Sequence, residues 1–283
     1  MIQDIFPKVF NNQFAKKTEP SQNDTVLTFS DSKILVNQNS EHIVNFPLIK
    51  DFSENKPSDF IYLFSVDDEK FFLLQNAQKL PENYDFVEVR ELRNQWNSEQ
   101  YKMMAAFTGK HLADWYKDTK FCGRCGNSMF HSDKERAMTC SKCGYTAYPR
   151  IMPAVIVGIL NKDKIVLTKY NRKGYQNYAL VAGFTEIGET AEETVAREVM
   201  EETGLKVKNI RYYKSQPWGI ANDLLLGYYC EVDGSTKIKM DDNELKFAEW
   251  IDRENVVLQP DNFSLTNEMM RMFKENKLDF CKD

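Results

Sequence analysis

Apolar residues in the second half of the chain recur in short runs with the length and spacing of β-strands. Residues 154–160 and 164–168 form two such runs, and the polar segment Asn161-Lys162-Asp163 between them predicts a turn. Further strands are expected over residues 178–182, 207–214, 224–232 and 247–251. A final helix is expected over residues 263–276, whose apolar side chains share one face: Leu265, Met269, Met270 and Phe273. This order of elements predicts an α+β fold, in which helices pack against a mixed sheet.

The first part of the chain is also rich in predicted strands. Short apolar runs separated by polar stretches predict a β-rich domain over residues 1–96, with strands near 26–29, 33–36, 60–64 and 70–74. No catalytic motif occurs there, so a scaffold or dimerisation role is expected. Residues 97–118 follow with apolar residues at helical spacing and predict a connecting helix. His111 lies in its aromatic stripe and is expected to be a hydrogen-bonded packing residue rather than a ligand.

A loop followed by a helix with a concentrated acidic face is predicted over residues 183–205. Glu198, Glu201 and Glu202 lie at positions i, i+3 and i+4, so a helix places the carboxylates on one face. Like charges so arranged destabilise a helix unless a cation lies among them. Gly204 stands where a left-handed residue is expected to end the helix. Because Mg²⁺ prefers carboxylate oxygens and keeps positions open for phosphates, this segment can hold divalent cations against a pyrophosphate.

Composition and charge limit the classes of protein to which the chain is expected to belong. The chain has 283 residues, enough for two domains, and its hydrophobic fraction of 42% and charged fraction of 28% are ordinary for a soluble protein. The formal net charge of −5 gives no global attraction to nucleic acid or anionic membrane. No apolar run approaches a membrane span, and the N-terminus lacks the pattern of a signal peptide. A cytoplasmic protein is therefore expected.

Two Cys-x-x-Cys pairs separated by fourteen residues predict a metal site over residues 119–148. The pairs are Cys122 with Cys125 and Cys140 with Cys143, and a glycine follows each pair. Four thiolates at this spacing suit a closed tetrahedral Zn²⁺ site, and the alternatives are a redox pair or an iron–sulfur centre. A closed site has no vacant position, so this zinc is expected to be structural. The same ribbon occurs in nucleic-acid-binding proteins, so it does not decide the function.

Nine positions of the acidic segment match a known pattern without a gap. Their spacing is that of a complete Nudix box, formed by Gly183, Glu189, Arg197, Glu198, Val199, Glu201, Glu202, Gly204 and Leu205. The alternative is an ordinary helix with a solvated acidic face. The order of zinc ribbon, Tyr148-Pro149-Arg150, box and Ser215-Gln216-Pro217-Trp218 resembles the NADH pyrophosphatase family of Nudix hydrolases. The resemblance extends from about residue 100 to the C-terminus.

The resemblance implies a fold and a set of site residues. The fold would be a Nudix α/β/α sandwich over residues 149–283, preceded by the zinc ribbon and the β-rich N-terminal domain. The ligands of the catalytic metals would be the Ala182 carbonyl and the carboxylates of Glu198, Glu202 and Glu244, with Glu201 close by. Substrate contacts would come from Glu135, Tyr148, Gln216, Pro217 and Trp218. Family members are typically homodimers whose subunits share the substrate site, so a homodimer is expected.

Several of these residues also admit structural interpretations. These are packing for Tyr148 and Trp218, a solvated surface for Glu135, and replacement of Glu244 by Asp241 or Asp242 as a ligand. Arg197 is expected to pair with a carboxylate of the box and to orient it. After Trp218 the family usually continues with Pro-Phe-Pro and then a Ser, whereas this chain has Gly219-Ile220-Ala221-Asn222-Asp223. This departure predicts a looser preference among dinucleotides.

The expected activity is hydrolysis of the pyrophosphate bond of NADH or NAD⁺ to nicotinamide mononucleotide and AMP, with Mg²⁺ or Mn²⁺. Glu201 is the candidate for orienting or deprotonating the attacking water. One alternative is the same hydrolysis at NAD caps on RNA 5′ ends. Another is hydrolysis of other dinucleotides, such as ADP-ribose, diadenosine or flavin–adenine pyrophosphates. A non-enzymatic nucleotide sensor on the same fold would be expected to lose carboxylates of the box, and this chain retains them.

Overall fold

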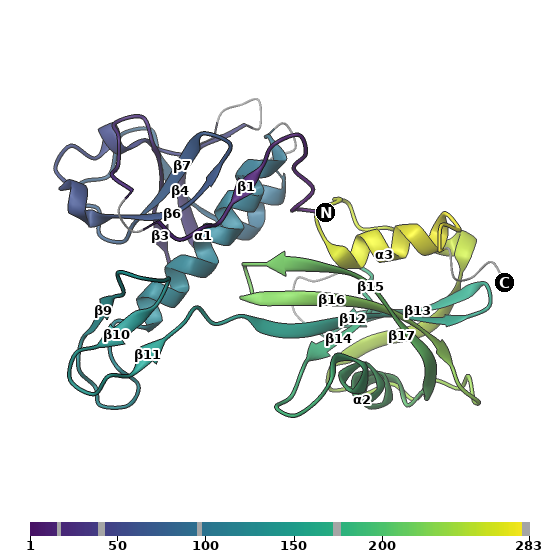
Figure 1. The fold of residues 1–283 in the computed structure, drawn as a ribbon. Coiled ribbons are helices and arrows are strands. Elements are labelled where there is room, and N and C mark those ends of the chain that lie inside the picture. Colours follow the sequence, from purple (N-terminus) through teal and green to yellow (C-terminus); the bar gives the residue numbers. More distant parts are fainter. Residues whose placement is uncertain (16–17, 39–42, 95–97, 172–176, 279–283) are drawn as a thin grey trace. The chain divides into compact units, whose positions relative to one another are not determined.

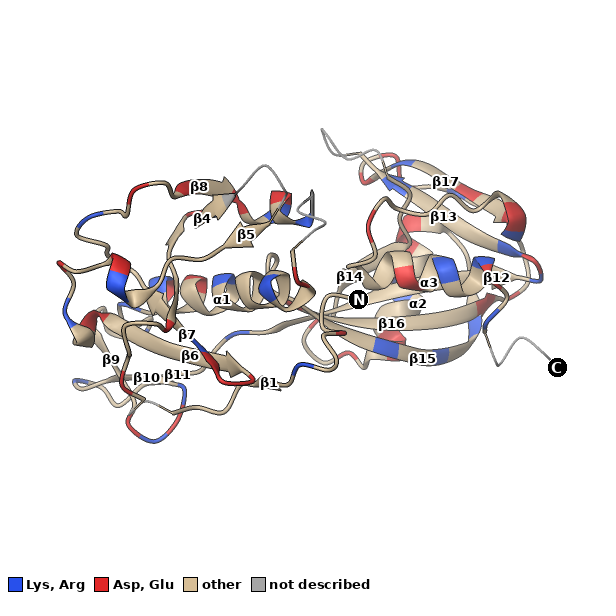
Figure 2. Ribbon diagram, turned by 90° about the horizontal axis from the view of Figure 1, so that it is seen from above, with Lys and Arg blue, Asp and Glu red and all other residues tan. Residues whose placement is uncertain are grey.

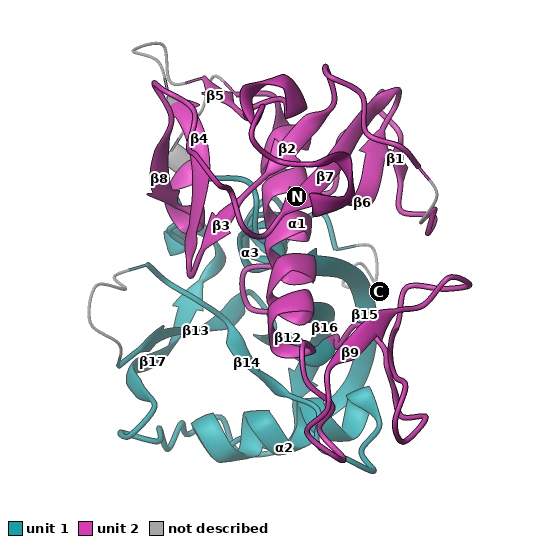
Figure 3. Ribbon diagram, turned by 90° about the vertical axis from the view of Figure 1, so that its left-hand side faces the viewer, with its two compact units in different colours: residues 1, 152–217, 223–283 teal, residues 2–151, 218–222 magenta. Residues whose placement is uncertain are grey.

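The computed structural model describes residues 1–15, 18–38, 43–94, 98–171 and 177–278. These residues form two compact units, each described here by itself (Figure 3). One unit comprises residues 1, 152–217 and 223–283, and we call it the sheet unit. The other comprises residues 2–151 and 218–222, and we call it the ribbon unit. None of the described helices combines the length and apolarity required to cross a bilayer.

The N-terminal region of the ribbon unit is β-rich, as the sequence predicts. One sheet has the order β1-β6-β7-β2, formed by Phe10–Asn11, Phe60–Val66, Glu69–Leu74 and Thr25–Leu27. A second sheet is formed by β3 (Phe29–Ser30), β4 (Lys33–Gln38), β5 (Val44–Asn45) and β8 (Asp85–Glu88). Short 3₁₀ segments at Ile49–Asp51 and Pro57–Asp59 lie between β5 and β6, and a third at Val89–Asn94 follows β8. Phe64, Phe71 and Phe72 are fully buried between these elements.

Helix α1 (Gln100–Asp118) packs against this β-rich region (Figure 1). Helix α1 begins three residues after the start predicted from sequence, and residue 97 itself lies outside the described residues. A β-carbon at Gly109 would lie 2.3 Å from Leu27 Cδ1, so glycine allows the close approach. His111 Nε2 lies 2.7 Å from the carbonyl oxygen of Arg150, which confirms that this histidine is a hydrogen-bonded packing residue.

The zinc ribbon follows α1 as a small sheet of three antiparallel strands. These are β9 (Met129–His131), β10 (Met138–Cys140) and β11 (Thr146–Ala147), in the order β11-β10-β9. Arg136 donates a hydrogen bond of 2.6 Å to the Leu63 carbonyl, and the rings of Tyr116 and His131 lie 5.1 Å apart. These contacts join the ribbon to the β-rich region and to α1 within one unit.

The sheet unit is built on a mixed sheet of six strands, as the element order predicts. Its strands are β12 (Met152–Asn161), β13 (Lys164–Tyr170), β14 (Val181–Phe184), β15 (Val207–Trp218), β16 (Asp223–Val232) and β17 (Leu245–Asp252). Strands β12 and β16 are parallel, and the other pairs with β12 and β13 are antiparallel. The strand predicted over residues 178–182 was placed too early in the sequence. Strand β14 begins at Val181, and Ala179 forms only an isolated bridge with Thr168.

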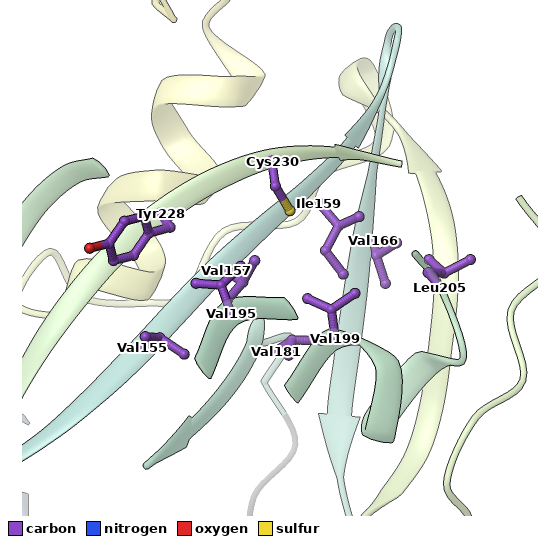
Figure 4. Packing of buried hydrophobic residues seen from close by; sticks show 10 residues of the cluster. All are labelled: Val155, Val157, Ile159, Val166, Val181, Val195, Val199, Leu205, Tyr228 and Cys230. Carbon is purple, nitrogen blue, oxygen red and sulfur yellow. The ribbon is translucent and has the colours of Figure 1, made fainter. Parts of the chain in front are cut away.

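Helices α2 (Ala191–Thr203) and α3 (Leu265–Lys274) cover opposite faces of this sheet (Figure 1). A short 3₁₀ segment at Arg253–Asn255 follows β17. Val195 and Val199 of α2 are fully buried in a cluster with β12, β13 and β16 residues (Figure 4). On the opposite face, Tyr229 donates a hydrogen bond of 2.8 Å to the Met269 carbonyl of α3. The resulting α/β/α sandwich places the acidic face of α2 next to the end of β14, where these two elements contact each other.

Candidate active site

The helix α2 is positioned by strong local signals at both ends. At its start, Thr190 and Glu193 form a reciprocal capping box, in which each side chain accepts a hydrogen bond from the other residue's backbone N–H. At its end, Gly204 has a φ of 68°, which confirms the expected left-handed C-cap. Because both ends are capped and Val195 and Val199 are buried, the acidic face has a fixed orientation.

Arg197 uses all of its N–H donors to hold the acidic segment together. Its Nε and Nη2 donate to the two oxygens of Glu189 at 2.6 and 2.9 Å, a bidentate pair. Its Nη1 donates to Glu198 at 2.7 Å and to Glu201 at 3.0 Å, and Nη2 also donates to the Phe184 carbonyl at 2.8 Å. The hydrogen bonds from Arg197 lower the pKa of Glu189 to about 2, and the same bonds raise the pKa of Arg197. The expected pairing of Arg197 with carboxylates of the box is confirmed.

Glu202 is a buried carboxylate that the protein compensates only in part. Its side chain is 2% exposed, and neither carboxylate oxygen has a hydrogen-bond partner among the described residues. Burial, followed by repulsion from Glu198 and Glu244, raises the pKa of Glu202 to about 8, and the backbone of Ala182 offsets this in part. A buried carboxylate with so little compensation is costly, so this position favours either a proton or a bound cation.

Glu198 lies between the arginine and the buried glutamate. Burial raises its pKa, and Arg197 opposes this shift, while Glu201 and Glu244 reinforce it. A β-carbon at Gly183 would lie only 1.9 Å from the Glu198 carboxyl carbon and 2.0 Å from its Oε1. Glycine at position 183 is therefore required for Glu198 to approach the end of β14.

The predicted ligands of the catalytic metal come together in the sheet unit. Ala182 of β14 pairs with Ile156 of the antiparallel strand β12. The backbone of Ala182 is next to the Glu202 carboxylate. Glu244 raises the pKa of both Glu198 and Glu202, which places its charge near theirs, and Asp241 contributes a smaller effect on Glu202. The carboxylate oxygens of these glutamates are more widely spaced than the sulfurs of the four cysteines. Among the described residues, only the four cysteines have ligand atoms that all lie within 4.8 Å.

The four cysteines form the cluster that the sequence predicts. Sγ of Cys122 lies 3.5 Å from Sγ of Cys143, and Sγ of Cys125 lies 3.5 Å from Sγ of Cys140. Gly126 and Gly144 follow the two pairs with φ of 75° and 71°, so each knuckle turns through a conformation that favours glycine. Four converging thiols supply the full set of ligands of a tetrahedral site and suit a structural zinc ion.

The remaining predicted substrate residues are distributed over both units. In the ribbon unit, Tyr148 donates a hydrogen bond of 2.9 Å to Glu135, so the structure brings these two predicted residues together. In the sheet unit, Gln216 is fully buried and its amide bonds to the Phe263 carbonyl and the Leu265 N–H, each at 2.7 Å. Gln216 therefore holds the start of α3 in this structure, and Pro217 beside it is exposed.

Trp218, the last residue of β15, belongs to the ribbon unit. Its ring lies 5.4 Å from the Phe107 ring in an edge-on arrangement, and the Arg93 guanidinium lies 5.6 Å above it. These contacts favour the packing interpretation of Trp218, and its predicted role in substrate binding stays a prediction.

Sequence analysis missed Phe184 as a functional candidate. This residue ends β14, its side chain is 51% exposed, and Arg197 holds its carbonyl. A half-exposed aromatic ring on backbone that is held beside the acidic cluster can stack on a base. The signal was present in the sequence, since Phe184 directly follows Gly183 of the box, but an apolar residue after a strand is usually core.

Comparisons with known proteins agree with this architecture. The NUDIX domain model matches residues 150–273, and the NADH pyrophosphatase zinc ribbon domain model matches residues 117–148. The chain is 42% identical over 177 residues to a protein named NAD-capped RNA hydrolase NudC from Salmonella typhimurium, which covers 62% of this chain and 67% of that protein. Proteins of the same name from Shigella dysenteriae and Citrobacter koseri are 43% and 45% identical over 157 and 152 residues. These two matches cover 56% and 54% of this chain, and 61% and 59% of the relatives, so the matched region spans about three-fifths of their length.

The zinc assignment predicts that Cys122→Ser lowers stability sharply, because the binding energy of a structural zinc contributes to folding. Elemental analysis of the purified protein should find one zinc per chain, and the variant should lose zinc and unfold at a lower temperature. Ser141→Ala, in the second knuckle but without a ligand atom, is the matched control and should keep its zinc. Iron in place of zinc, or no metal at all, would contradict the assignment.

The burial of Glu202 predicts a pH-dependent gain of stability in Glu202→Gln without divalent cations. The pKa of Glu202 is raised to about 8 in the folded protein, so ionisation destabilises the wild type progressively from about pH 4.5 to pH 8. The variant should match the wild type near pH 4.5 and exceed it at pH 8 by about 1–3 kcal/mol, measured by denaturant titration in EDTA. Equal stability at both pH values would refute the argument.

The contact between Gly183 and Glu198 predicts that Gly183→Ala displaces the carboxylate. A methyl group at position 183 cannot coexist with Glu198 at its present place, and overpacking of this kind costs about 1–3 kcal/mol. The variant should remain folded but bind Mn²⁺ at least tenfold more weakly by calorimetry. Unchanged Mn²⁺ affinity would show that Glu198 contributes nothing to cation binding.

Proposed function

Because the chain belongs to the NUDIX family and carries the zinc ribbon of its NADH pyrophosphatases, we propose that it hydrolyses the pyrophosphate bond of NADH or NAD⁺. The products would be nicotinamide mononucleotide and AMP. The observation that carries this proposal is the acidic cluster around Glu202, whose buried and unpaired carboxylate is suited to a divalent cation. A similar fold alone would not support hydrolysis, since function depends on the residues of the site.

The donor set fits a hard divalent cation, Mg²⁺ or Mn²⁺. Its ligands would be the carboxylates of Glu198, Glu202 and Glu244 with the carbonyl of Ala182. Burial, together with the repulsion among these carboxylates, raises the pKa values of Glu198 and Glu202, and positive charge among them would favour their ionised forms. When bound, such a cation stabilises the charge that develops on the pyrophosphate and lowers the pKa of a coordinated water.

Protein side chains orient the reacting groups in this proposal. Arg197 holds Glu198 and Glu201 at fixed distances of 2.7 and 3.0 Å, and its bidentate bond to Glu189 anchors the guanidinium. The Glu201 side chain is 58% exposed, and only its Oε2 is bonded to Arg197. Its Oε1 is therefore free to accept a hydrogen bond from the attacking water, as a positioning group or a general base.

Aromatic side chains would recognise the bases of the substrate. Phe184 ends β14, where Arg197 holds its carbonyl, and its ring can stack on a base attached to the pyrophosphate. Tyr148 is 58% exposed, and its hydrogen bond to Glu135 fixes the ring in the ribbon unit. A homodimer, which the resemblance implies, is included in the proposal.

Removal of NAD caps from RNA is the second candidate function. The relatives in the comparison carry that name, and the ribbon has local positive charge despite the net charge of the chain. Residues 119–150 contain six Lys and Arg and two Asp and Glu, a difference of +4, which four thiolates around Zn²⁺ would reduce to +2. Acidic and basic residues occur in both units (Figure 2). A modest positive ribbon is compatible with a short RNA contact.

Glu198→Gln should lower kcat for NADH by at least two orders of magnitude while the fold survives, because a ligand of the cation is lost. The measurement is product analysis by chromatography over a panel of NADH, NAD⁺, ADP-ribose and NAD-capped RNA with saturating Mg²⁺ or Mn²⁺. Glu192→Gln is the matched control on the same helix, where Glu192 bonds to Tyr228 rather than to the cluster. Near-normal turnover in Glu198→Gln would refute the proposed role, and turnover of none of the four substrates would refute the function.

Phe184→Ala should reduce kcat/KM for NADH more than for ADP-ribose, which lacks the nicotinamide. Stacking of a base on an aromatic ring contributes about 1–3 kcal/mol, so the difference should be roughly five- to 150-fold. Trp218→Ala is the comparison variant. Because its ring packs on Phe107, it should lower the unfolding temperature and affect both substrates equally. Selective loss of NADH activity in Trp218→Ala instead would transfer the recognition role to that residue.

A further inference from the structure

Glu244 is the proposed ligand that lies farthest along the chain from the others. The other three belong to β14 and α2, which contact each other. Glu244 instead stands directly before β17, after the strands β15 and β16. The residues that lead to it, which we call the 239–244 segment, therefore decide whether its carboxylate reaches the acidic face of α2.

The 239–244 segment is anchored at its start to the end of α2. The Lys239 N–H donates a hydrogen bond of 2.8 Å to the Thr203 carbonyl, and the Asp241 N–H donates one of 3.1 Å to the Glu202 carbonyl. The last carbonyls of a helix have no partner within the helix, so the segment satisfies two of them. The backbone of Glu202 is thereby tied to the residue that lies three positions before Glu244.

The other end of the 239–244 segment is anchored to β13. The Asn171 N–H, directly after this strand, donates a hydrogen bond of 2.8 Å to the Glu244 carbonyl. Leu245 is buried and pairs with Tyr170, the last residue of β13. Because both ends are fixed, the turn at residues 241–243 between them determines the backbone direction at Glu244.

Asp241 closes this turn with its side chain and its backbone. Its Oδ1 accepts hydrogen bonds of 2.9 Å from both the backbone N–H and the side-chain amide of Asn243. Its carbonyl accepts from the N–H groups of Glu244 at 3.3 Å and Leu245 at 3.0 Å. An aspartate that bonds to the backbone two residues later forms an Asx turn. Loss of the Asp241 side chain would therefore release Asn243 and loosen the approach to Glu244.

The carboxylate of Asp241 takes part in this turn more than in the acidic face of α2. Its Oδ1 already accepts two hydrogen bonds, which leaves this oxygen little capacity for a cation. Burial and repulsion from Glu198 contribute most to the raised pKa of Glu202, and Glu244 contributes more to it than Asp241 does. The charge of Glu244 thus acts more strongly on the buried carboxylate. These observations favour Glu244 as the ligand and Asp241 as its support.

We propose that Asp241 is a positioning residue, which directs Glu244 toward the cation site by closing the turn at residues 241–243. The inference rests on the proposed function, because Glu244 is a ligand only if this site binds a divalent cation. Asp241 contributes an acceptor oxygen rather than its charge. Asparagine, which has the same Oδ1, can therefore replace Asp241, whereas alanine cannot.

The first measurement is Mn²⁺ binding to the full-length protein by calorimetry. Asp241→Ala should weaken binding about 10- to 100-fold, as loss of a group that orients a metal ligand usually does. Asp241→Asn should bind Mn²⁺ as tightly as the control Asp242→Asn, which removes the same charge from the next residue, an exposed one. Asp242→Ala is the matched control for Asp241→Ala.

The second measurement observes the turn itself without added Mn²⁺. Hydrogen exchange, followed by mass spectrometry of peptides that cover residues 241–246, reports on the amides of Asn243 and Glu244. These amides should exchange faster in Asp241→Ala than in the wild type, and at the wild-type rate in Asp241→Asn. A residue that acted only as a ligand would not change exchange in the absence of the cation.

Weak Mn²⁺ binding in Asp241→Asn together with normal binding in Asp242→Asn would identify Asp241 as a ligand and overturn the proposal. Similar weakening in both asparagine variants would overturn it too, because total charge would then be the cause. Unchanged affinity in Asp241→Ala, or no Mn²⁺ binding by the wild type, also overturns it. If Asp241→Ala does not fold, the comparison of the two asparagine variants still decides.

Failure of the proposed function would be recognised separately. A wild-type protein that binds Mn²⁺ but hydrolyses none of NADH, NAD⁺, ADP-ribose and NAD-capped RNA would refute that function and leave the role of Asp241 intact. Conversely, normal hydrolysis with unchanged Mn²⁺ affinity in Asp241→Ala would refute the positioning role alone.

Discussion

The structure of the sheet unit depends on holding several carboxylates on one helix face against their mutual repulsion. Arg197 does this with five hydrogen bonds, to Glu189, Glu198, Glu201 and the Phe184 carbonyl. It neutralises part of the charge of the face but forms no hydrogen bond or salt bridge with Glu202, whose buried carboxylate oxygens have no hydrogen-bond partner among the described residues. The fold thus leaves one buried carboxylate, and a proton or a bound cation would lower the free-energy cost of burying its charge.

The rest of the sheet unit makes this arrangement possible. Capping at Thr190 and Gly204 fixes the limits of α2, and the buried Val195 and Val199 fix its rotation on the sheet. Gly183 then removes the side chain that would occupy the place of the Glu198 carboxylate. Stability and function oppose each other here, because the same burial that disfavours an ionised Glu202 creates the affinity for a positive charge.

Sequence patterns predicted much of this because the decisive interactions are local. The spacing of Glu198, Glu201 and Glu202, the capping glycine and the pairing of Arg197 all lie within one loop and helix, and the cysteine pairs lie within one ribbon. The packing of Gln216 on the start of α3 and of Trp218 on Phe107 joins residues distant in sequence. Such contacts leave no periodicity, so the sequence did not predict them, and the substrate roles that the resemblance implies for Gln216 and Trp218 stay predictions. The start of β14 was misplaced for a similar reason, since its pairing with β12 joins residues distant in sequence and leaves no local pattern.

In the proposed function, the groups for cleavage all lie in one unit, whereas the residues for recognition are distributed over both. Ala182, the glutamates of α2 and Glu244 all belong to the sheet unit, so the predicted cation site is complete within it. Glu135, Tyr148 and Trp218 belong to the ribbon unit, and β15 carries the chain from one unit to the other at Trp218. Substitutions in residues 219–222 therefore alter the ribbon unit without touching a carboxylate of the cluster. Divergence confined to that segment is expected to change what is bound while the chemistry of cleavage is retained.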